Sequence, residues 1–213
     1  MESRLELPTR PLQPFGHPNA LKDFSLNAGA IWHDQRLLVR FELSGPLQQL
    51  RIPAPATPAQ RRDGLWQSTC VEAFVGVRGQ AAYWEINLCP SGHWNLYGLT
   101  GYRQDLRPET AVQTLPLKRQ QGWHEADRWE HLSLAFELPL QVDGTDLIWG
   151  PRTPDDSLPG KPLATELEIS ATAVLDHQQH GCSYWAWRHT TNEADFHQRS
   201  SFVPLQQRFS AGF

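Results

Sequence analysis

The sequence has few cysteines and no paired cysteine motif. Its three cysteines, Cys70, Cys89 and Cys182, are an odd number without CxxC spacing. This pattern argues against a disulfide framework and against a zinc site made of thiolates. We therefore predict reduced thiols that are partly buried.

Long apolar runs are also missing. No segment approaches the ~18 consecutive apolar residues that a membrane-spanning helix needs. The stretch from Met1 to Pro8 has neither the apolar region nor the small-residue cleavage site of a secretory signal. We expect a soluble, cytoplasmic protein that has no membrane partner.

The chain lacks an excess of charge of one sign. Its formal net charge is −4 and its pI is about 6.1, and no run of Lys and Arg is interleaved with aromatic residues, so nucleic acid is not an expected partner. The composition is that of a globular protein, with 39% hydrophobic residues, nine Trp and nine Phe. We predict an extended Pro-rich arm over residues 1–22 and a single domain over residues 23–213.

Amphipathic helical stretches and internal repeats are absent as well. The dominant pattern is instead the two-residue alternation of half-buried strands, which recurs at residues 37–43, 132–138 and 167–173. Turn-rich stretches separate such segments, and the longest of them covers residues 150–160. Short strands joined by such turns predict an all-β fold, a sandwich or a barrel.

The segments 70–77, 82–88 and 94–99 predict a three-stranded β-meander. Apolar residues take the odd positions of the first segment and the even positions of the second, so each strand has one dry face and one mixed face. The mixed face is predicted to carry Glu72, Phe74, Tyr83, Glu85, Asn87, Asn95 and Tyr97.

The predicted turns also determine the register of this meander. A tight turn at Arg78 and Gly79 places Glu72 directly opposite Glu85. A three-residue loop over residues 90–92 places Glu85 opposite Tyr97.

Two carboxylates directly across a ladder repel each other by up to ~1 kcal/mol, so Glu72 and Glu85 need compensation. In one interpretation an internal partner, Arg103 or Arg188, or solvent supplies it. In the other, the carboxylates accept hydrogen bonds from ligand hydroxyls or help to hold a cation, and the neighbouring aromatic rings supply apolar contact.

A second aromatic cluster lies near the C-terminus. Trp185, Trp187 and His189 share one face of a predicted strand, which is either sandwich core or a platform for sugar rings. The neighbouring histidines have loose spacing, so we predict neither a metal site nor a Cys–His or His–Asp catalytic arrangement. These neighbours are His177, His180, Cys182, Asp195 and His197.

The strings at residues 65–74, 83–94 and 102–103 are similar to the DOMON-like proteins related to family-9 carbohydrate-binding modules. Residues 187–189 and 195–202 resemble the closing segment of that group. The resemblance implies an antiparallel β-sandwich of immunoglobulin-like or jelly-roll type, which binds sugar in some branches and haem in others. Haem-binding relatives use a Met and a His as axial ligands, whereas the only Met here is Met1. This disfavours a Met/His pair and leaves a bis-His pair open.

The leading hypothesis is a non-catalytic module that binds a carbohydrate or a similar polyhydroxylated small molecule. We predict no cofactor, with Ca²⁺ and haem as open alternatives. One competing hypothesis is a haem-binding or redox module. Another is a glycoside hydrolase that uses Glu72 and Glu85, because glycosidases place paired carboxylates ~5–9.5 Å apart. The predicted ligand-binding residues are Glu72, Phe74, Tyr83, Glu85, Asn87, Asn95, Tyr97, Arg103, Trp185, Trp187 and His189.

Overall fold

The computed structural model describes residues 5–16, 21–125, 128–142, 145–146 and 166–207. The predicted turn-rich stretch 150–160 lies outside the described residues. Almost all of the regular structure is β-strand. The strands are β1 (Leu5–Pro11), β2 (Gln13–Pro14), β3 (Ser25–His33), β4 (Arg36–Gly45), β5 (Cys70–Val77), β6 (Tyr83–Leu88), β7 (Trp94–Leu99), β8 (Arg107–Pro108), β9 (Leu117–His124), β10 (Trp129–Pro139), β11 (Gln141–Val142), β12 (Thr145–Asp146), β13 (Leu167–His177), β14 (Gly181–Ala186), β15 (Val203–Pro204) and β16 (Gln206–Gln207). The described residues also include the short 3₁₀ helices η2 (Leu47–Gln49), η3 (Leu65–Gln67) and η6 (Arg199–Ser201).

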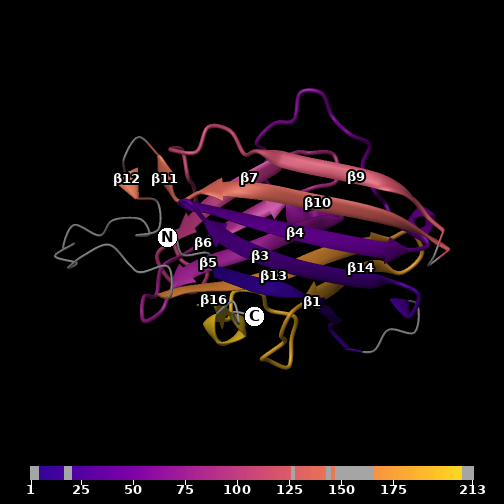
Figure 1. Ribbon diagram of the computed structural model, residues 1–213. Helices are drawn as coiled ribbons and strands as arrows, with labels where there is room; N and C mark the ends of the chain where they lie inside the picture. The colour runs from indigo at the N-terminus through magenta and orange to yellow at the C-terminus, as the bar shows by residue number, and fades with distance from the viewer. Residues whose placement is uncertain (1–4, 17–20, 126–127, 143–144, 147–165, 208–213) are drawn as a thin grey trace, which may run out of the picture.

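The described strands form two large antiparallel sheets that pack face to face (Figure 1). One sheet has six strands in the order β16-β1-β3-β4-β10-β9. The other has eight, in the order β2-β14-β13-β5-β6-β7-β8, with β15 paired to β13. The architecture is therefore the predicted antiparallel β-sandwich.

The core lies between the two sheets because the alternating apolar residues of each strand point inward. In β4, Leu37, Val39, Phe41 and Leu43 are buried, while the residues between them are exposed or partly exposed. β10 repeats this pattern. β13 differs, because both of its faces are largely buried. Something must therefore cover the outer face of the eight-stranded sheet.

The N-terminal segment is part of both sheets rather than a separate arm. β1 pairs with β3 in the six-stranded sheet, and β2 pairs with β14 in the eight-stranded sheet. Leu5, Leu7 and Leu12 are buried in the core. The prediction of an arm that lies over the domain is corrected in this respect, because the extended backbone gains ladder hydrogen bonds by joining the sheets.

The predicted register of the first hairpin is wrong by two residues. β5 and β6 pair Glu72 with Asn87, Phe74 with Glu85 and Gly76 with Tyr83. Because the side-chain period is two, this shift leaves every residue on its predicted face. It also removes the direct opposition of two carboxylates, which is unfavourable across a ladder.

The predicted register of the second hairpin is confirmed. β6 and β7 pair Asn87 with Asn95, Glu85 with Tyr97 and Tyr83 with Leu99. The loop between them bends at Gly92, whose φ is +91°, a backbone conformation that glycine adopts without strain.

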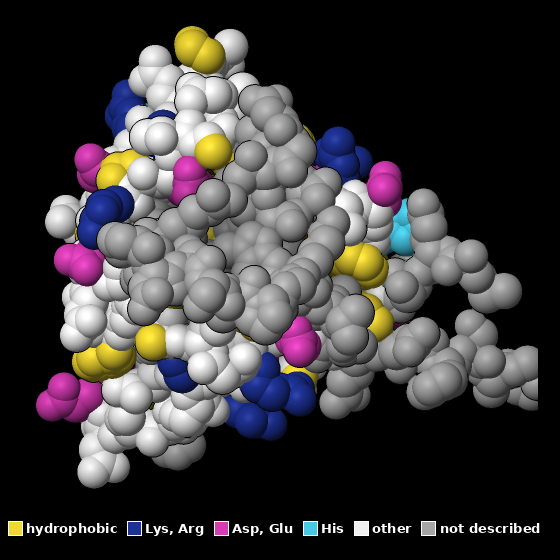
Figure 2. Space-filling model, turned by 90° about the vertical axis from the view of Figure 1, so that its left-hand side faces the viewer, with side chains coloured by type: hydrophobic (Ala, Val, Ile, Leu, Met, Phe, Trp, Pro, Cys, Tyr) yellow, Lys and Arg dark blue, Asp and Glu magenta, His cyan; other side chains and the backbone are white. Residues whose placement is uncertain are grey.

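Charges of both signs occur at one end of the sandwich. In the view of Figure 2, basic and acidic side chains are both present around the edge of the described part. The three cysteines are unpaired, with Cys70 and Cys89 buried and Cys182 exposed. None of the described helices is long and apolar enough to cross a membrane.

Candidate functional site

The mixed face of the β5–β6–β7 meander is covered, not open. All seven of its predicted residues are buried. Two chain segments cover it, residues 61–67 before β5 and residues 195–202 near the C-terminus. Between these covers lies a pocket, and its floor carries Glu72 and Glu85.

The first cover satisfies the polar groups of β7. Arg61 donates to Asn95 Oδ1 at 2.7 Å and to three backbone carbonyls. Asn95 Nδ2 and the Tyr97 hydroxyl both donate to Asp63 Oδ1, at 2.9 and 2.7 Å. Burial and the neighbouring Asp63 raise the pKa of Tyr97. Asn95 and Tyr97 therefore belong to an internal polar network.

The second cover packs aromatic rings on the other end of the meander. A small buried cluster separate from the main core contains Phe74, Tyr83, Tyr97, Leu99 and Phe202. Phe74 and Tyr83 therefore hold the second cover, residues 195–202 (the closing segment), in place through apolar contact.

The guanidinium of Arg199, in this segment, lies against Gly76. A Cβ at Gly76 would come within 1.7 Å of Arg199 Nη1. The same guanidinium donates to Val77 O at 2.9 Å and to Glu168 Oε2 at 3.1 Å. The close approach therefore requires a glycine at position 76.

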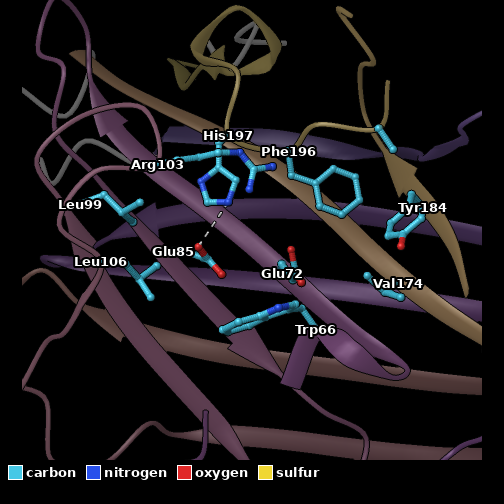
Figure 3. Close-up of a pocket in the computed structure, with 11 residues that line it drawn as sticks. Trp66, Glu72, Glu85, Leu99, Arg103, Leu106, Val174, Tyr184, Phe196 and His197 are labelled. Atoms are coloured by element: carbon cyan, nitrogen blue, oxygen red, sulfur yellow. Dashed lines mark ion pairs between the residues drawn. The ribbon is translucent and has the colours of Figure 1, made fainter. Parts of the chain in front are cut away.

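The pocket between the covers has a volume of about 340 Å³. Figure 3 shows the two carboxyls at its centre, with aromatic side chains around them. Its lining residues come from strands β5, β6, β7, β13 and β14, from η3 and from two loops. They are Trp66, Glu72, Glu85, Leu99, Arg103, Leu106, Val174, Tyr184, Ala194, Phe196 and His197.

The two carboxyls are buried and only half satisfied. Glu72 Oε2 accepts a hydrogen bond from Thr172 at 3.3 Å, and Glu85 Oε1 accepts one from Asn87 at 2.8 Å. The remaining oxygens, Glu72 Oε1 and Glu85 Oε2, have no hydrogen-bond partner among the described residues. Burial raises the pKa of both groups, and the charge of Glu85 raises that of Glu72 further.

His197 faces Glu85 from the closing segment. Its Nε2 lies 3.8 Å from Glu85 Oε2 (Figure 3). Its Nδ1 lies 2.8 Å from the Tyr83 hydroxyl. The backbone N–H of Arg103 donates to that hydroxyl at 3.2 Å, so the hydroxyl hydrogen is available to Nδ1. Neutral His197 then carries its hydrogen on Nε2, toward Glu85. Burial and the nearby Arg103 charge lower the pKa of His197 to about 4.

Asp195 holds Arg103 at the rim. Arg103 Nη2 donates to Asp195 Oδ1 at 3.0 Å, and the Tyr102 hydroxyl donates to Asp195 Oδ2 at 2.5 Å. Burial alone would raise the pKa of Asp195, but its hydrogen bonds lower it to about 2. The rim cation is therefore already paired with an internal carboxylate.

The aromatic residues predicted near the C-terminus lie elsewhere. Trp185 and Trp187 are buried in the main core, so the interpretation as a ligand platform is corrected to core. His189 Nε2 donates to Gln13 O at 2.8 Å and its ring contacts Phe15. These three side chains do not line the pocket. Arg188 is exposed and does not line the pocket either.

Sequence reasoning missed three aromatic walls of the pocket, Trp66, Tyr184 and Phe196. In the alternation at residues 184–188, Tyr184 takes the face opposite Trp185 and Trp187. Once that Trp pair is assigned to the core, Tyr184 must face outward. Trp66 lies in η3, where no periodic pattern indicates its direction.

The histidine clusters do not form a metal site. Among the described residues, no group of three or more His, Cys, Asp or Glu side chains is arranged to hold a metal ion. His177 Nε2 instead lies 3.1 Å from Gln49 Oε1.

Comparisons with known proteins extend the description of the fold. No protein-family model and no curated protein matches the sequence. A solved structure of a "putative carbohydrate-binding protein" from Bacteroides uniformis is similar, with a TM-score of 0.60 and 13% sequence identity over 93% of this chain and 85% of that one. At this identity the likeness concerns the fold alone. This chain therefore has a β-sandwich fold that is also found in a protein described in those words, and the DOMON-like resemblance stays a prediction.

Proposed function

We propose that this chain is a non-catalytic module that binds a carbohydrate or a similar polyhydroxylated small molecule in the pocket above Glu72 and Glu85. The main support is the pair of buried carboxyl oxygens that lack partners among the described residues. Buried polar atoms are nearly always hydrogen-bonded. A ligand hydroxyl both donates and accepts, so it suits a carboxyl in either protonation state.

The walls of the pocket fit the same class of ligand. Trp66 and Tyr184 are partly exposed, at 37% and 43%, and they offer apolar rings beside the polar floor. Sugars combine C–H faces with hydroxyls, so they match this mixture. The volume of about 340 Å³ lies within the usual range of small-molecule pockets. The fold shared with the Bacteroides uniformis protein is compatible with this function.

The carboxyls are less suited to glycoside hydrolysis. Glycosidases use a pair in which one carboxyl has a raised pKa and the other stays ionised. Here burial raises the pKa of both Glu72 and Glu85. Neither environment favours the ionised nucleophile or base that the reaction needs, which supports binding over catalysis.

Calorimetry of the purified protein against mono- and oligosaccharides tests this proposal. We expect at least one neutral sugar or amino sugar to bind, and EDTA to leave its affinity unchanged. Truncation of a wall residue, Trp66→Ala, should weaken binding roughly three- to tenfold, since an aromatic contact contributes about 0.5–1.5 kcal/mol.

Trp123→Ala is the matched control. Trp123 is 58% exposed and lies on β9 of the other sheet, so its loss should leave affinity unchanged. The proposal is wrong if no sugar binds, or if binding depends on Trp123 and not on Trp66.

A further inference from the structure

The floor of the pocket has two carboxyl groups and no basic group that forms a hydrogen bond to either of them among the described residues. Glu72 and Glu85 both line it. Each has one carboxyl oxygen without a hydrogen-bond partner among the described residues, and the two residues are only 3% and 4% exposed. Two neighbouring carboxyls in a poorly solvated site ionise together only when a cation offsets their repulsion. Glu72 and Glu85 therefore need a cation close to them if both are to be ionised.

The described basic groups of the lining compensate the floor only in part. Burial has the larger effect on the pKa of Glu85 and raises it, while the charge of Arg103 lowers it, and the Arg103 guanidinium donates to Asp195, a carboxylate outside the floor. His197 uses Nδ1 for Tyr83 and is held 3.8 Å from Glu85, beyond hydrogen-bond distance. The low pKa of His197, about 4, keeps it neutral at physiological pH. Among the described residues, Glu72 accepts a hydrogen bond from the uncharged Thr172, so no basic side chain would compete there with the cation of a ligand.

The walls add a second, independent feature that suits a cation. Trp66, Tyr184 and Phe196 line the space around the carboxyls (Figure 3). The faces of aromatic rings attract ammonium groups, most strongly in sites that exclude water. Tyr184 and Phe196 lie with ring centroids 6.1 Å apart, so one group can contact both.

We propose that the ligand of this pocket carries an ammonium group beside its hydroxyls, and that Glu72 and Glu85 bind this group while the aromatic walls surround it. Amino sugars with a free amine are the matching chemical class. The inference rests on the proposed function and narrows it. It distinguishes ligands by charge, whereas the proposed function requires only hydroxyls.

A set of matched probes tests the inference in the full chain at neutral pH. Glucosamine carries the ammonium group, glucose replaces it with a hydroxyl, and N-acetylglucosamine replaces it with a neutral amide. We expect glucosamine to bind at least about tenfold more tightly than the other two, because a hydrogen bond between ionised groups is roughly twice as strong as a neutral one. Glucuronic acid, an anion, should bind more weakly than glucose.

The variants Glu72→Gln and Glu85→Gln should each reduce the preference for glucosamine over glucose, because they keep the shape of the side chain and remove its charge. Glu137→Gln is the control. Glu137 pairs with Arg36 on the other sheet, and its substitution removes the same charge from the whole chain. Thermal unfolding verifies that each variant is folded. A preference that survives in both pocket variants, or that falls equally in the control, overturns the inference.

The outcomes separate the two proposals. Equal affinity for glucose and glucosamine overturns the ammonium preference and leaves the proposed function standing. Binding of cyclohexylamine, which has the amine and ring but no hydroxyl, without binding of any sugar overturns the proposed function. Failure of every probe to bind overturns both.

Discussion

At the scale of single residues, the two pocket carboxyls work against stability when they ionise. Burial raises the pKa of Glu72 well above its ordinary value of 4.5, so the folded protein binds a proton that the unfolded chain has released. Stability from this group is therefore full below pH 4.5 and decreases as pH rises toward the folded pKa. His197, whose pKa falls from 6.5 to about 4, acts in the opposite direction and loses its contribution as pH falls through that range.

We expect Glu72→Gln to stabilise the protein at neutral and alkaline pH. Glutamine keeps the shape and cannot ionise, so the gain should reach about 1–2 kcal/mol and should shrink as pH falls toward 4.5. Urea unfolding over a pH series measures it. The partly exposed Glu137→Gln should change stability by less than about 0.5 kcal/mol. A gain that is independent of pH would indicate a packing effect instead.

At the scale of elements, residues 195–202 are held to β5 by a contact between Arg199 and Gly76, which has no side chain. Arg199 covers Gly76, and its guanidinium lies 4.4 Å from the ring centroid of Phe202. The same segment carries Phe196 and His197 into the pocket. Displacement of Arg199 should therefore affect both stability and the pocket.

Gly76→Ala should destabilise the protein by about 1–3 kcal/mol, which is the usual range for overpacking, and should weaken ligand binding as well. The added methyl overlaps the guanidinium, so Arg199 must move. Gly122→Ala on β9 is the matched control, because a Cβ there meets nothing within 4 Å. Denaturant unfolding and calorimetry provide the two measurements. Equal effects of the two substitutions would contradict this role of Gly76.

At the scale of the whole molecule, β14 separates the core from the pocket. Trp185 points between the sheets, and its neighbour Tyr184 points to the outer face, where it lines the pocket. Trp187, which follows β14, also belongs to the core. Stability and binding should therefore depend on different aromatic residues of one short segment.

Trp187→Ala should cost about 3–5 kcal/mol of stability, as expected for a large core residue. Tyr184→Ala should leave the free energy of unfolding within about 0.5 kcal/mol of the parent and reduce ligand affinity. Thermal unfolding and calorimetry on the pair test the assignment. If a Trp187→Ala variant kept its stability and lost affinity, Trp187 would belong to the ligand site and not to the core.

Local patterns in the sequence were sufficient to predict which side chains lie on the same face of each strand of the meander. The alternation around Glu72 and Glu85 placed both on one side of the meander, and the short loop after Leu88 fixed the second register correctly. The first register failed because the connection from Val77 to Tyr83 is longer than the tight turn at Arg78 and Gly79 indicates. A shift of two residues preserves the face pattern, so alternation alone does not detect it.

The sequence by itself determined the all-β class and the grouping of carboxyls with aromatic residues, because these depend on periodicity over a few neighbouring residues. Periodicity left a sandwich and a barrel open, and the resemblance to DOMON-like proteins implied the sandwich. Only the tertiary structure decided which face is core and what covers the other one. His197 and Phe196 reach Glu85 and Glu72 from over a hundred positions away in the chain. Such contacts leave no trace in a local pattern. The ligand face predicted for the meander is thus a covered pocket in which only Glu72 and Glu85 of the seven meander residues line the space.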